Sequence, residues 1–457
     1  MPTLRLSSAG FLPIAFAVTT LCGCGTTALG PDRGTVSTIL GERIGLSLSP
    51  DAALSQPTFP PGAALDDGLT EDEAVAVALW NNAAFQELLV DLGLARGDLI
   101  QAGLLPNPEF VYFLGVGDKP LKYLFDFPIE AIWLRPIRVK SAAREADRTA
   151  ARLSQAGLDL MRDVRQAYAD VVLAAERVRI AGEAVKLRSR VAELAQKRLT
   201  AGEISEQEAA TARIDSLQAE QDALRIGYDV PILEERLRNL MGIGMLRGPL
   251  PLDPSPPQSC GTLEPDALAQ EAMSGRPDAL AAADALAAAD ARLQFAKLGW
   301  VRLLGIADAT SGRNGHEFGP ALRFTVPLFN RNQGGIVRAE AERERAVRNQ
   351  RTTAYQIILD VQRACLQYRQ ASAELDLLST KVRPEAEAAI RRAQAAYQEG
   401  NVPIFIVLET TRQLLDNYLR EAVLKSDLRR FRAELERSVG RRLASASPVR
   451  ADEGKPK

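Results

Sequence analysis

The strongest constraint on the fold is a seven-residue apolar repeat that occurs in both halves of the chain. In the second half, two such seams run side by side over about 357–382. One seam consists of Ile357, Ala364, Ala371 and Leu378, and the other of Val361, Tyr368, Leu375 and Val382. The first half repeats the pattern with Val164, Val171, Val178 and Val185. This spacing is typical of long helices that lie against neighbouring helices as a coiled coil.

Each seam belongs to a predicted helical hairpin that reverses at a glycine. Gly202 and Gly400 mark the two turns, because glycine ends a helix in the left-handed conformation without steric cost. A constant offset of 198 residues relates these two glycines, and also Gly242 to Gly440, which indicates a duplication. An arm of roughly 60 residues is on the order of 90 Å long, well beyond an ordinary globular helix.

The composition excludes several classes of function. A net charge of −2 provides no basic excess for binding nucleic acid. The chain has one histidine, His316, and the spacing of its four cysteines is not that of a metal site. It also lacks the GxSxG elbow, the P-loop and the glycine-rich dinucleotide turn. We therefore expect no cofactor, no metal and no enzymatic activity.

The N-terminus indicates an exported lipoprotein. Residues 1–23 have one early charge, Arg5, followed by a short apolar segment, as a signal peptide does. The sequence Leu-Cys-Gly-Cys that ends at Cys24 resembles a bacterial lipobox, with Cys24 as the lipid-modified first residue of the mature protein. Gly25 follows where aspartate would favour the inner membrane, so we expect an anchor in outer-membrane lipid. The alternative is ordinary signal cleavage that leaves Cys24 as a free thiol.

The mature chain divides into two repeats with a linker between them. Residues 24–68 are rich in Gly, Pro, Ser and Thr, which predicts an extended lead segment from the lipid anchor. The repeats cover 69–248 and 263–440, and each is expected to contain a helix, a strand pair and a long hairpin. A proline-rich linker covers 249–262, and the polar tail, 441–457, is predicted to be disordered.

Within the first repeat, capping and proline signals predict the element boundaries. Thr70 and Glu73 form a capping box that starts a helix, which we expect to continue to about Ala102. Pro128 and Pro136 are expected to close the strand region, so that the first long hairpin begins near Val139.

Two regions rich in aromatic residues read as strand pairs. The expected strands are 110–114 with 123–127, and 300–310 with 318–329. Such strands suit a membrane β-barrel, with Trp133 and Trp300 in its interface belt. A small soluble sheet packed on the helices remains the alternative, because alternation is poor in the first strand.

If the strands span a membrane, one chain is not sufficient. The backbone groups at a sheet edge cannot stay unpaired in lipid, and the smallest bacterial barrels have about eight strands. The unpartnered heptad seams also need neighbours. Both features predict an obligate homo-oligomer.

Over about Leu69 to Gly440 the chain resembles the TolC-like outer-membrane efflux proteins. The segments that carry the resemblance are 69–78 followed by Asn82, 101–108 (QAGLLPNP), 326–329 (VPLF), and 397–400 (YQEG) with 407–409 (VLE). The segment 330–334 (NRNQG) resembles the heavy-metal-efflux branch. Two departures stand out: Gly275-Arg276-Pro277 replaces the Asn-Asn-Ala of the first repeat, and Gln207-Glu208 replaces an aspartate-hydrophobic pair.

The resemblance implies a mainly α fold with a small membrane β part. Duplicated coiled-coil hairpins would form a trimeric α-barrel across the periplasm, and four strands per chain would contribute to a shared twelve-stranded outer-membrane β-barrel. Two short helical segments per chain would form a belt midway. The partners implied are two further copies, a periplasmic adaptor and an inner-membrane pump of the RND type, and no nucleic acid.

The function implied is the exit duct of a tripartite efflux system, or of a type I secretion-like system. The hairpin turns would form the periplasmic mouth and the adaptor contact, through Leu199, Gly202, Ile204, Tyr397, Gly400 and Val402. The alternatives are a periplasmic adaptor and a structural coiled-coil lipoprotein without a channel. An adaptor has one hairpin flanked by β-rich domains, and a structural coiled coil leaves the aromatic strands unexplained.

Overall fold

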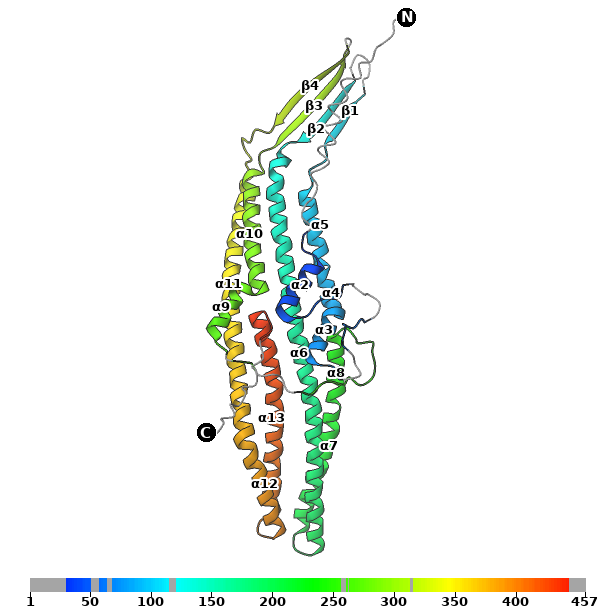
Figure 1. Cartoon of the computed structure of the whole chain (residues 1–457), viewed down its shortest axis with the longest axis vertical. Coiled ribbons are helices and arrows are strands. Elements are labelled where there is room, and N and C mark those ends of the chain that lie inside the picture. Colours follow the sequence, from blue (N-terminus) through cyan, green and yellow to red (C-terminus); the bar gives the residue numbers. More distant parts are fainter. Residues whose placement is uncertain are drawn as a thin grey trace, which may run out of the picture. The chain divides into compact units, whose positions relative to one another are not determined.

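The computed structural model describes residues 30–50, 57–63, 68–114, 121–255, 260–261, 263–312 and 315–443 (Figure 1). The signal peptide, Cys24 and the tail from residue 444 lie outside the described residues. The chain divides into two compact units. The first takes Met1–Thr35, Val90–Arg152 and Leu280–Thr353, and the second takes Val36–Leu89, Leu153–Ala279 and Ala354–Lys457. Each unit contains segments of both sequence repeats, so the repeats are not separate compact bodies.

The first unit consists of a sheet and the helical segments that follow and precede its strands. The strands are β1 (Glu109–Phe113), β2 (Lys122–Pro128), β3 (Leu303–Gly312) and β4 (Gly315–Phe324). The helices are α5 (Asp91–Gly103), α10 (Pro277–Leu298) and the first parts of α6 (Glu130–Thr200) and α11 (Gln333–Leu377). Polar contacts join α6 to α10, with Arg144–Asp284 at 3.1 Å and Arg292–Glu145 at 2.7 Å.

The expected start of the first hairpin is wrong by nine residues. Helix α6 begins at Glu130 and continues through Pro136. Proline has a φ compatible with a helix, and near the start of a long helix its lost hydrogen bond and the crowding of its ring are outweighed by the turns that follow. The Glu130 carboxylate accepts a hydrogen bond from the Leu303 N–H at 3.1 Å, which fixes the start of α6 against β3.

The second unit is helical. It contains α2 (Arg33–Ile44, from Val36), α3 (Glu71–Asn81), α4 (Ala83–Leu89), α7 (Glu206–Gly227), α8 (Asp229–Leu240), α9 (Pro265–Gly275), α12 (Arg383–Gln398), α13 (Ile404–Val439) and the later parts of α6 and α11. The capping box of Thr70 and Glu73 at the start of α3 is confirmed. Among the helices that the structure describes, none combines the length and the apolar content needed to cross a membrane.

Two expectations for the N-terminal third are wrong. The segment 24–68 is not extended throughout, because Arg33–Ile44 form α2, whose Val36, Leu40 and Ile44 are buried. The single helix expected up to Ala102 is divided into α3, α4 and α5. The first division lies at Asn82, whose side chain accepts a hydrogen bond from the Phe85 N–H and so caps the next helix.

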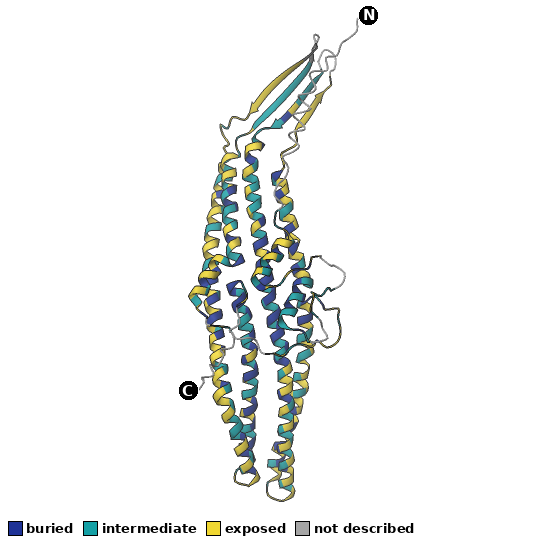
Figure 2. Cartoon of the chain, viewed as in Figure 1, coloured by how far each residue is buried: buried dark blue, intermediate teal, exposed yellow. Residues whose placement is uncertain are grey.

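Buried residues recur between exposed ones along the long helices (Figure 2), and several of the heptad positions are among the buried residues. Ile357, Ala364 and Ala371 are at most 3% exposed. Val382, however, is 39% exposed, because a π-helical turn (Leu378–Val382) precedes Pro384 and shifts the register. In the first half Val178 is 37% exposed, and Leu173 and Ile180 are buried instead. A straight α-helix drifts relative to a strict heptad, which accounts for this change of face.

A buried ion network joins the two repeats inside the second unit. The Arg165 side chain of α6 is 6% exposed and pairs with Asp72 of α3 at 2.8 Å and with Glu436 of α13. Arg437 of α13 bridges Asp159 of α6 at 2.7 Å and Asp360 of α11 at 3.2 Å. Removing one member of such a network leaves a buried charge unpaired. The network therefore favours one position of α13 against α6 and α11.

Candidate functional site

The four strands form one antiparallel sheet in the order β1-β2-β3-β4. Residues directly opposite each other in an antiparallel pair lie on the same face, so the register assigns every side chain to a face. Phe110, Phe125, Ala307 and Pro320 are opposite one another along one row across the sheet. Tyr112, Tyr123, Ala309 and Phe318 form the next row on that face.

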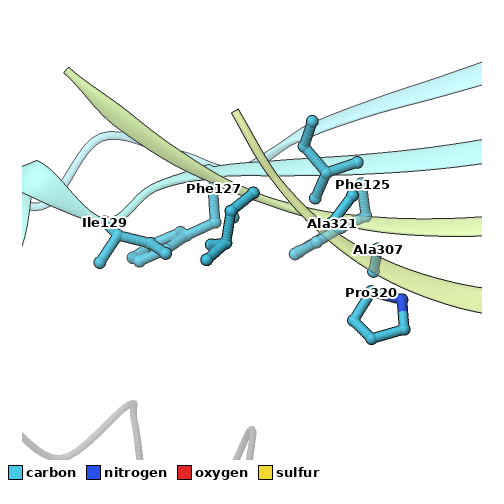
Figure 3. Close-up of a pocket in the computed structure, with 9 residues that line it drawn as sticks. Phe125, Phe127, Ile129, Ala307, Pro320 and Ala321 are labelled. Atoms are coloured by element: carbon cyan, nitrogen blue, oxygen red, sulfur yellow. The ribbon is translucent and has the colours of Figure 1, made fainter. Parts of the chain in front are cut away.

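This face is apolar and exposed. Phe110 is 63% exposed, Phe318 71% and Phe324 68%. An apolar hollow of about 630 Å³ lies at its base (Figure 3), and its lining includes Phe125, Phe127, Ile129, Gly305, Ala307 and Pro320. Exposed aromatic side chains on a sheet are costly in water and favourable in lipid.

The opposite face carries the charges of the sheet. Lys122 and Asp308 form an ion pair at 2.7 Å across β2 and β3, and Asp126 and Arg323 form another at 3.6 Å. Glu109 lies directly opposite Asp126. The weak alternation of the first strand remains, because Val111 and Phe113 share the charged face with Glu109 and are exposed. The cross-strand register nevertheless places the charged residues of all four strands on this one face. A wall with these two faces suits a channel with lipid outside and water inside.

The two hairpin turns have the same backbone geometry, 198 residues apart. Gly202 has φ +76° and its N–H donates to the Leu199 carbonyl at 2.9 Å. Gly400 has φ +80° and its N–H donates to the Tyr397 carbonyl at 3.0 Å. A longer-range bond accompanies each turn, from Glu203 to Arg198 and from Asn401 to Ala396, both at 2.9 Å. This pair of bonds is the Schellman pattern that ends a helix at glycine.

The hairpin turns pack against each other within one chain. Their shared cluster of buried residues comprises Val191, Ala195, Ala212, Ala393, Tyr397, Ile404 and Val407, with Ile204 and Val402 against it. The Arg198 guanidinium lies 4.7 Å from the centre of the Tyr397 ring and donates to the Tyr397 carbonyl oxygen at 3.1 Å. The ring thus has a cationic partner on one of its faces.

This packing changes the assignment of the predicted mouth residues. Tyr397 is 2% exposed, so its side chain is not available to a partner. Leu199, Ile204 and Val402 are half-buried, and only the two glycines among the six residues are exposed. The sequence reasoning missed Phe405, which is 66% exposed on the first turn of α13, and its neighbour Ile406, which is 40% exposed. The signal was present in the run Ile404-Phe-Ile-Val407, because a helix buries only one side of four consecutive apolar residues.

The predicted interface tryptophans and the 330–334 motif lie in the first unit. Trp133 is the fourth residue of α6 and is 39% exposed, while Trp300 precedes β3 and is 36% exposed. In the motif, Asn332 has φ +61° and donates from its side chain to the Ala296 carbonyl at 2.9 Å. The motif therefore forms the turn into α11. Within the described part of the chain, no cluster of three or more His, Cys, Asp or Glu is placed to hold a metal ion.

Comparisons with known proteins agree with this geometry. The chain is 25% identical over 415 residues to the cobalt-zinc-cadmium resistance protein CzcC of Cupriavidus metallidurans, covering 86% of this chain and 97% of that protein. Its fold is similar to a membrane protein of Pseudomonas aeruginosa (19% identity, TM-score 0.70, covering 85% of this chain and 99% of that one). It is also similar to CusC, described for transmembrane channel formation (18% identity, TM-score 0.68, covering 85% and 96%).

A family match extends over most of both repeats. The model of the outer membrane efflux protein family matches residues 134–243 and 268–441, which is more than half of the chain. The match includes both long hairpins and agrees with the resemblance drawn from the short sequence segments. The expected fold class and the expected role as an efflux duct are confirmed, and the adaptor and the channel-free coiled coil are not favoured. The chain belongs to the outer membrane efflux protein family, whose members are the outer-membrane exit ducts of tripartite efflux systems.

Proposed function

We propose that the protein works as a homotrimer in which each copy contributes four strands to a twelve-stranded barrel. The supporting observation is that β1 and β4 are each paired on one side only in the described sheet. Unpaired backbone groups are not tolerated in lipid, and four strands are too few to close a barrel. Pairing β1 of one copy with β4 of the next satisfies both edges. The hairpins of the three copies would then surround the periplasmic duct.

The two faces of the sheet carry this proposal. The apolar face, with Phe110, Phe318 and Phe324, would contact lipid. The polar face, with the Lys122–Asp308 and Asp126–Arg323 pairs, would line the water-filled lumen. Trp133 and Trp300 lie beside the strands in sequence and are partly exposed, as residues of an interface belt would be.

We infer a second attachment to the outer membrane through Cys24. The support is the Leu-Cys-Gly-Cys segment, which lies outside the described residues. Cys24→Ser should abolish incorporation of labelled palmitate and leave the precursor uncleaved, while Cys260→Ser should change neither. Labelling that persists in Cys24→Ser would exclude this site. The barrel would still hold the variant in the membrane.

We also propose that the exposed ends of the hairpins contact a periplasmic adaptor that links the duct to an RND-type pump. Phe405 and Ile406 offer the apolar surface for that contact, and Gly202 and Gly400 shape the turns beside it. Leu199, Ile204, Val402 and Tyr397 would support the turns from within the shared cluster. This division follows the burial of each side chain, since a partner can bind only what it can reach.

For the substrate we propose heavy-metal cations. The support is the similarity over 97% of CzcC, which is named for cobalt, zinc and cadmium resistance. The duct itself needs only a wide polar lumen, so the pump would make the selection. The test is growth of the source bacterium without this gene on graded cobalt, zinc and cadmium, with antibiotics in parallel. Sensitivity to the metals alone supports the proposal, and sensitivity to antibiotics alone contradicts it.

The trimer is tested separately. Protein extracted from outer membranes in mild detergent should have the mass of three copies by native mass spectrometry. A stable monomer with intact secondary structure would exclude a shared barrel, whatever the substrate is.

A further inference from the structure

We propose that Cys260 and Cys365 form a disulfide that fastens the linker between the two repeats to helix α11. The sequence predicts no bond between them, because one lies in the proline-rich linker and the other inside a long helix. The structure holds both as free thiols, but it places them against the same buried cluster of the second unit.

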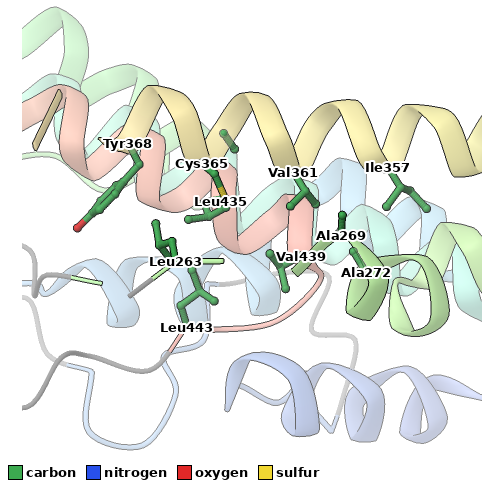
Figure 4. Close-up of a cluster of buried hydrophobic side chains, with 11 residues drawn as sticks. Leu263, Ala269, Ala272, Ile357, Val361, Cys365, Tyr368, Leu435, Val439 and Leu443 are labelled. Atoms are coloured by element: carbon green, nitrogen blue, oxygen red, sulfur yellow. The ribbon is translucent and has the colours of Figure 1, made fainter. Parts of the chain in front are cut away.

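Cys365 is fully buried in this cluster (Figure 4). The other members include Leu263, Val361, Tyr368, Leu435 and Val439. Cys260 is partly buried and packs against the cluster from the linker. Two segments that are separate in sequence therefore meet at this point, with one cysteine on each.

A hydrogen bond fixes the linker close to Cys365. The Cys260 N–H donates to the hydroxyl of Tyr368 at 3.0 Å. Tyr368 is three residues beyond Cys365 on α11, and residues at this spacing lie on the same side of a helix. The side of α11 that anchors the Cys260 backbone is thus the side that carries the Cys365 thiol.

The electrostatics of the two thiols agree with this proximity. Burial raises the pKa of Cys365, Arg369 lowers it in part, and the Cys260 thiol raises it further. Burial also raises the pKa of Cys260, and the Tyr368 hydroxyl partly offsets that effect. Both side chains are thiols at neutral pH, so they react slowly once the cluster is packed. We therefore place bond formation during folding, when the linker is still open.

The environment supplies the oxidant. A protein of the outer membrane folds in the periplasm, where disulfides form and persist. The Cys260 thiolate attacks the disulfide of a periplasmic thiol–disulfide oxidoreductase and displaces one of its sulfurs as a thiolate. The Cys365 thiolate then attacks Cys260 in the mixed disulfide and displaces the second sulfur. Two cysteine thiols are oxidised, and the oxidoreductase disulfide is reduced to two thiols that take the two protons.

The bond would close a loop of roughly 100 residues that contains α9, α10, β3, β4 and the first part of α11. Closing a long loop stabilises a protein mainly by restricting the unfolded chain. With Cys24 used for the lipid, these are the only two thiols of the mature chain. The disulfide would thus fasten the end of the linker to α11 of the second repeat, independently of the ion network.

Peptide mapping tests the proposal directly. The protein is isolated from outer membranes, its free thiols are alkylated under denaturing conditions, and it is digested with trypsin without reduction. Cys365 lies in the short peptide 364–369, and Cys260 in the peptide 248–292, because trypsin does not cleave before Pro277. We expect these two peptides as one cross-linked species that reduction separates. Alkylation of both cysteines before reduction, or a Cys260–Cys260 bond between copies, would overturn the proposal.

A stability measurement keeps the test independent of mapping. A phosphine reductant should lower the thermal midpoint of the wild type to that of Cys260→Ser. The same reductant should leave Cys260→Ser unchanged, so this variant serves as the matched control. A wild-type midpoint that does not respond to reductant would contradict the proposal, whether or not the protein exports metals.

Discussion

The guanidinium of Arg276 donates to the Ser438 carbonyl oxygen at 3.2 Å, in the place where the first repeat joins the Asn82 side chain to the Leu240 carbonyl at 2.8 Å. Both acceptors lie at the end of a hairpin's returning helix, two residues before a glycine of positive φ. The duplicated repeats thus keep one contact with different side chains. At Gly275-Arg276-Pro277, where the sequence differs from the first repeat, Arg276 keeps the hydrogen bond to the end of the returning helix. It also adds ion pairs with Asp278 and Asp360.

Arg276→Ala should therefore destabilise the protein more than Asn82→Ala. The Arg276 side chain is 2% exposed, and its loss leaves Asp278 and the Ser438 carbonyl without this donor. We expect a loss of about 3 kcal/mol in the free energy of unfolding for Arg276→Ala and about 1 kcal/mol for Asn82→Ala. Denaturant unfolding of both variants in detergent measures the difference. Asn82→Ala also removes the cap on the Phe85 N–H, so equal losses would mean that the ion pairs of Arg276 contribute no more than this cap does.

The periodic features of the fold were predictable from the sequence, whereas changes of the buried face along a helix and contacts between distant segments were not. The hairpin turns and the capping box follow from local chemistry, and the structure has them as expected. The change of face at Val178 and the π-helical turn before Pro384 depend on how long helices drift over many turns. The burial of Tyr397 depends on Arg198 and on the other hairpin, nearly 200 residues away in the sequence. Local pattern carries no signal for such partners, so the burial of Tyr397 was missed. The exposure of Phe405, in contrast, could have been inferred from the four consecutive apolar residues at 404–407.

Gly242 should tolerate substitution far less than Gly202. Both have positive φ, which costs an alanine about 1 kcal/mol. A Cβ at Gly202 meets no atom within 4 Å, whereas at Gly242 it would lie 2.1 Å from the Asn81 carbonyl oxygen. Gly242→Ala must therefore also displace the end of α3. Thermal unfolding should show a small shift for Gly202→Ala and a much larger one for Gly242→Ala, and similar shifts would contradict the close packing.

Acid should weaken the ion network through Asp72. Burial alone would raise the pKa of this carboxyl, but Arg165 and Arg442 outweigh it and hold the pKa below its usual value. A lowered folded pKa contributes stability that is present above the unfolded pKa, about 3.9, and is lost as the pH falls through the folded pKa. The stability difference between wild type and Asp72→Asn should thus be full at pH 7 and shrink below about pH 4.

The pKa of Glu71 is shifted in the opposite direction to that of Asp72. Burial raises its pKa, and the charges of Arg165 and Arg429 offset this only in part. Its contribution is present below the unfolded pKa and is lost as the pH rises through the folded value. The loss of stability caused by Glu71→Gln should therefore not shrink on acidification as that of Asp72→Asn does. Parallel pH profiles for the two variants would show that the assigned shifts are wrong.

Phe405→Asp should abolish efflux and leave the oligomer intact. The Phe405 side chain is exposed and makes no part of the buried cluster at the hairpin ends, so a charge there disturbs a partner and not the fold. Gln413→Asp, two turns further along α13 and also exposed, is the control and should keep resistance. Cross-linking to the adaptor and native mass spectrometry separate the two effects. Full resistance in Phe405→Asp would exclude docking at this residue.

We infer that the sheet separates lipid from a water-filled lumen, and two adjacent residues of β3 test this inference. Ala309 lies on the apolar face opposite Tyr123 and Phe318, while Thr310 lies on the polar face opposite Lys122 and Glu317. Ala309→Cys and Thr310→Cys are compared in intact outer membranes with a water-soluble maleimide, above the labelling of the parent protein. We predict rapid labelling of Thr310→Cys and little labelling of Ala309→Cys. Equal labelling of both, or the reverse order, would contradict it.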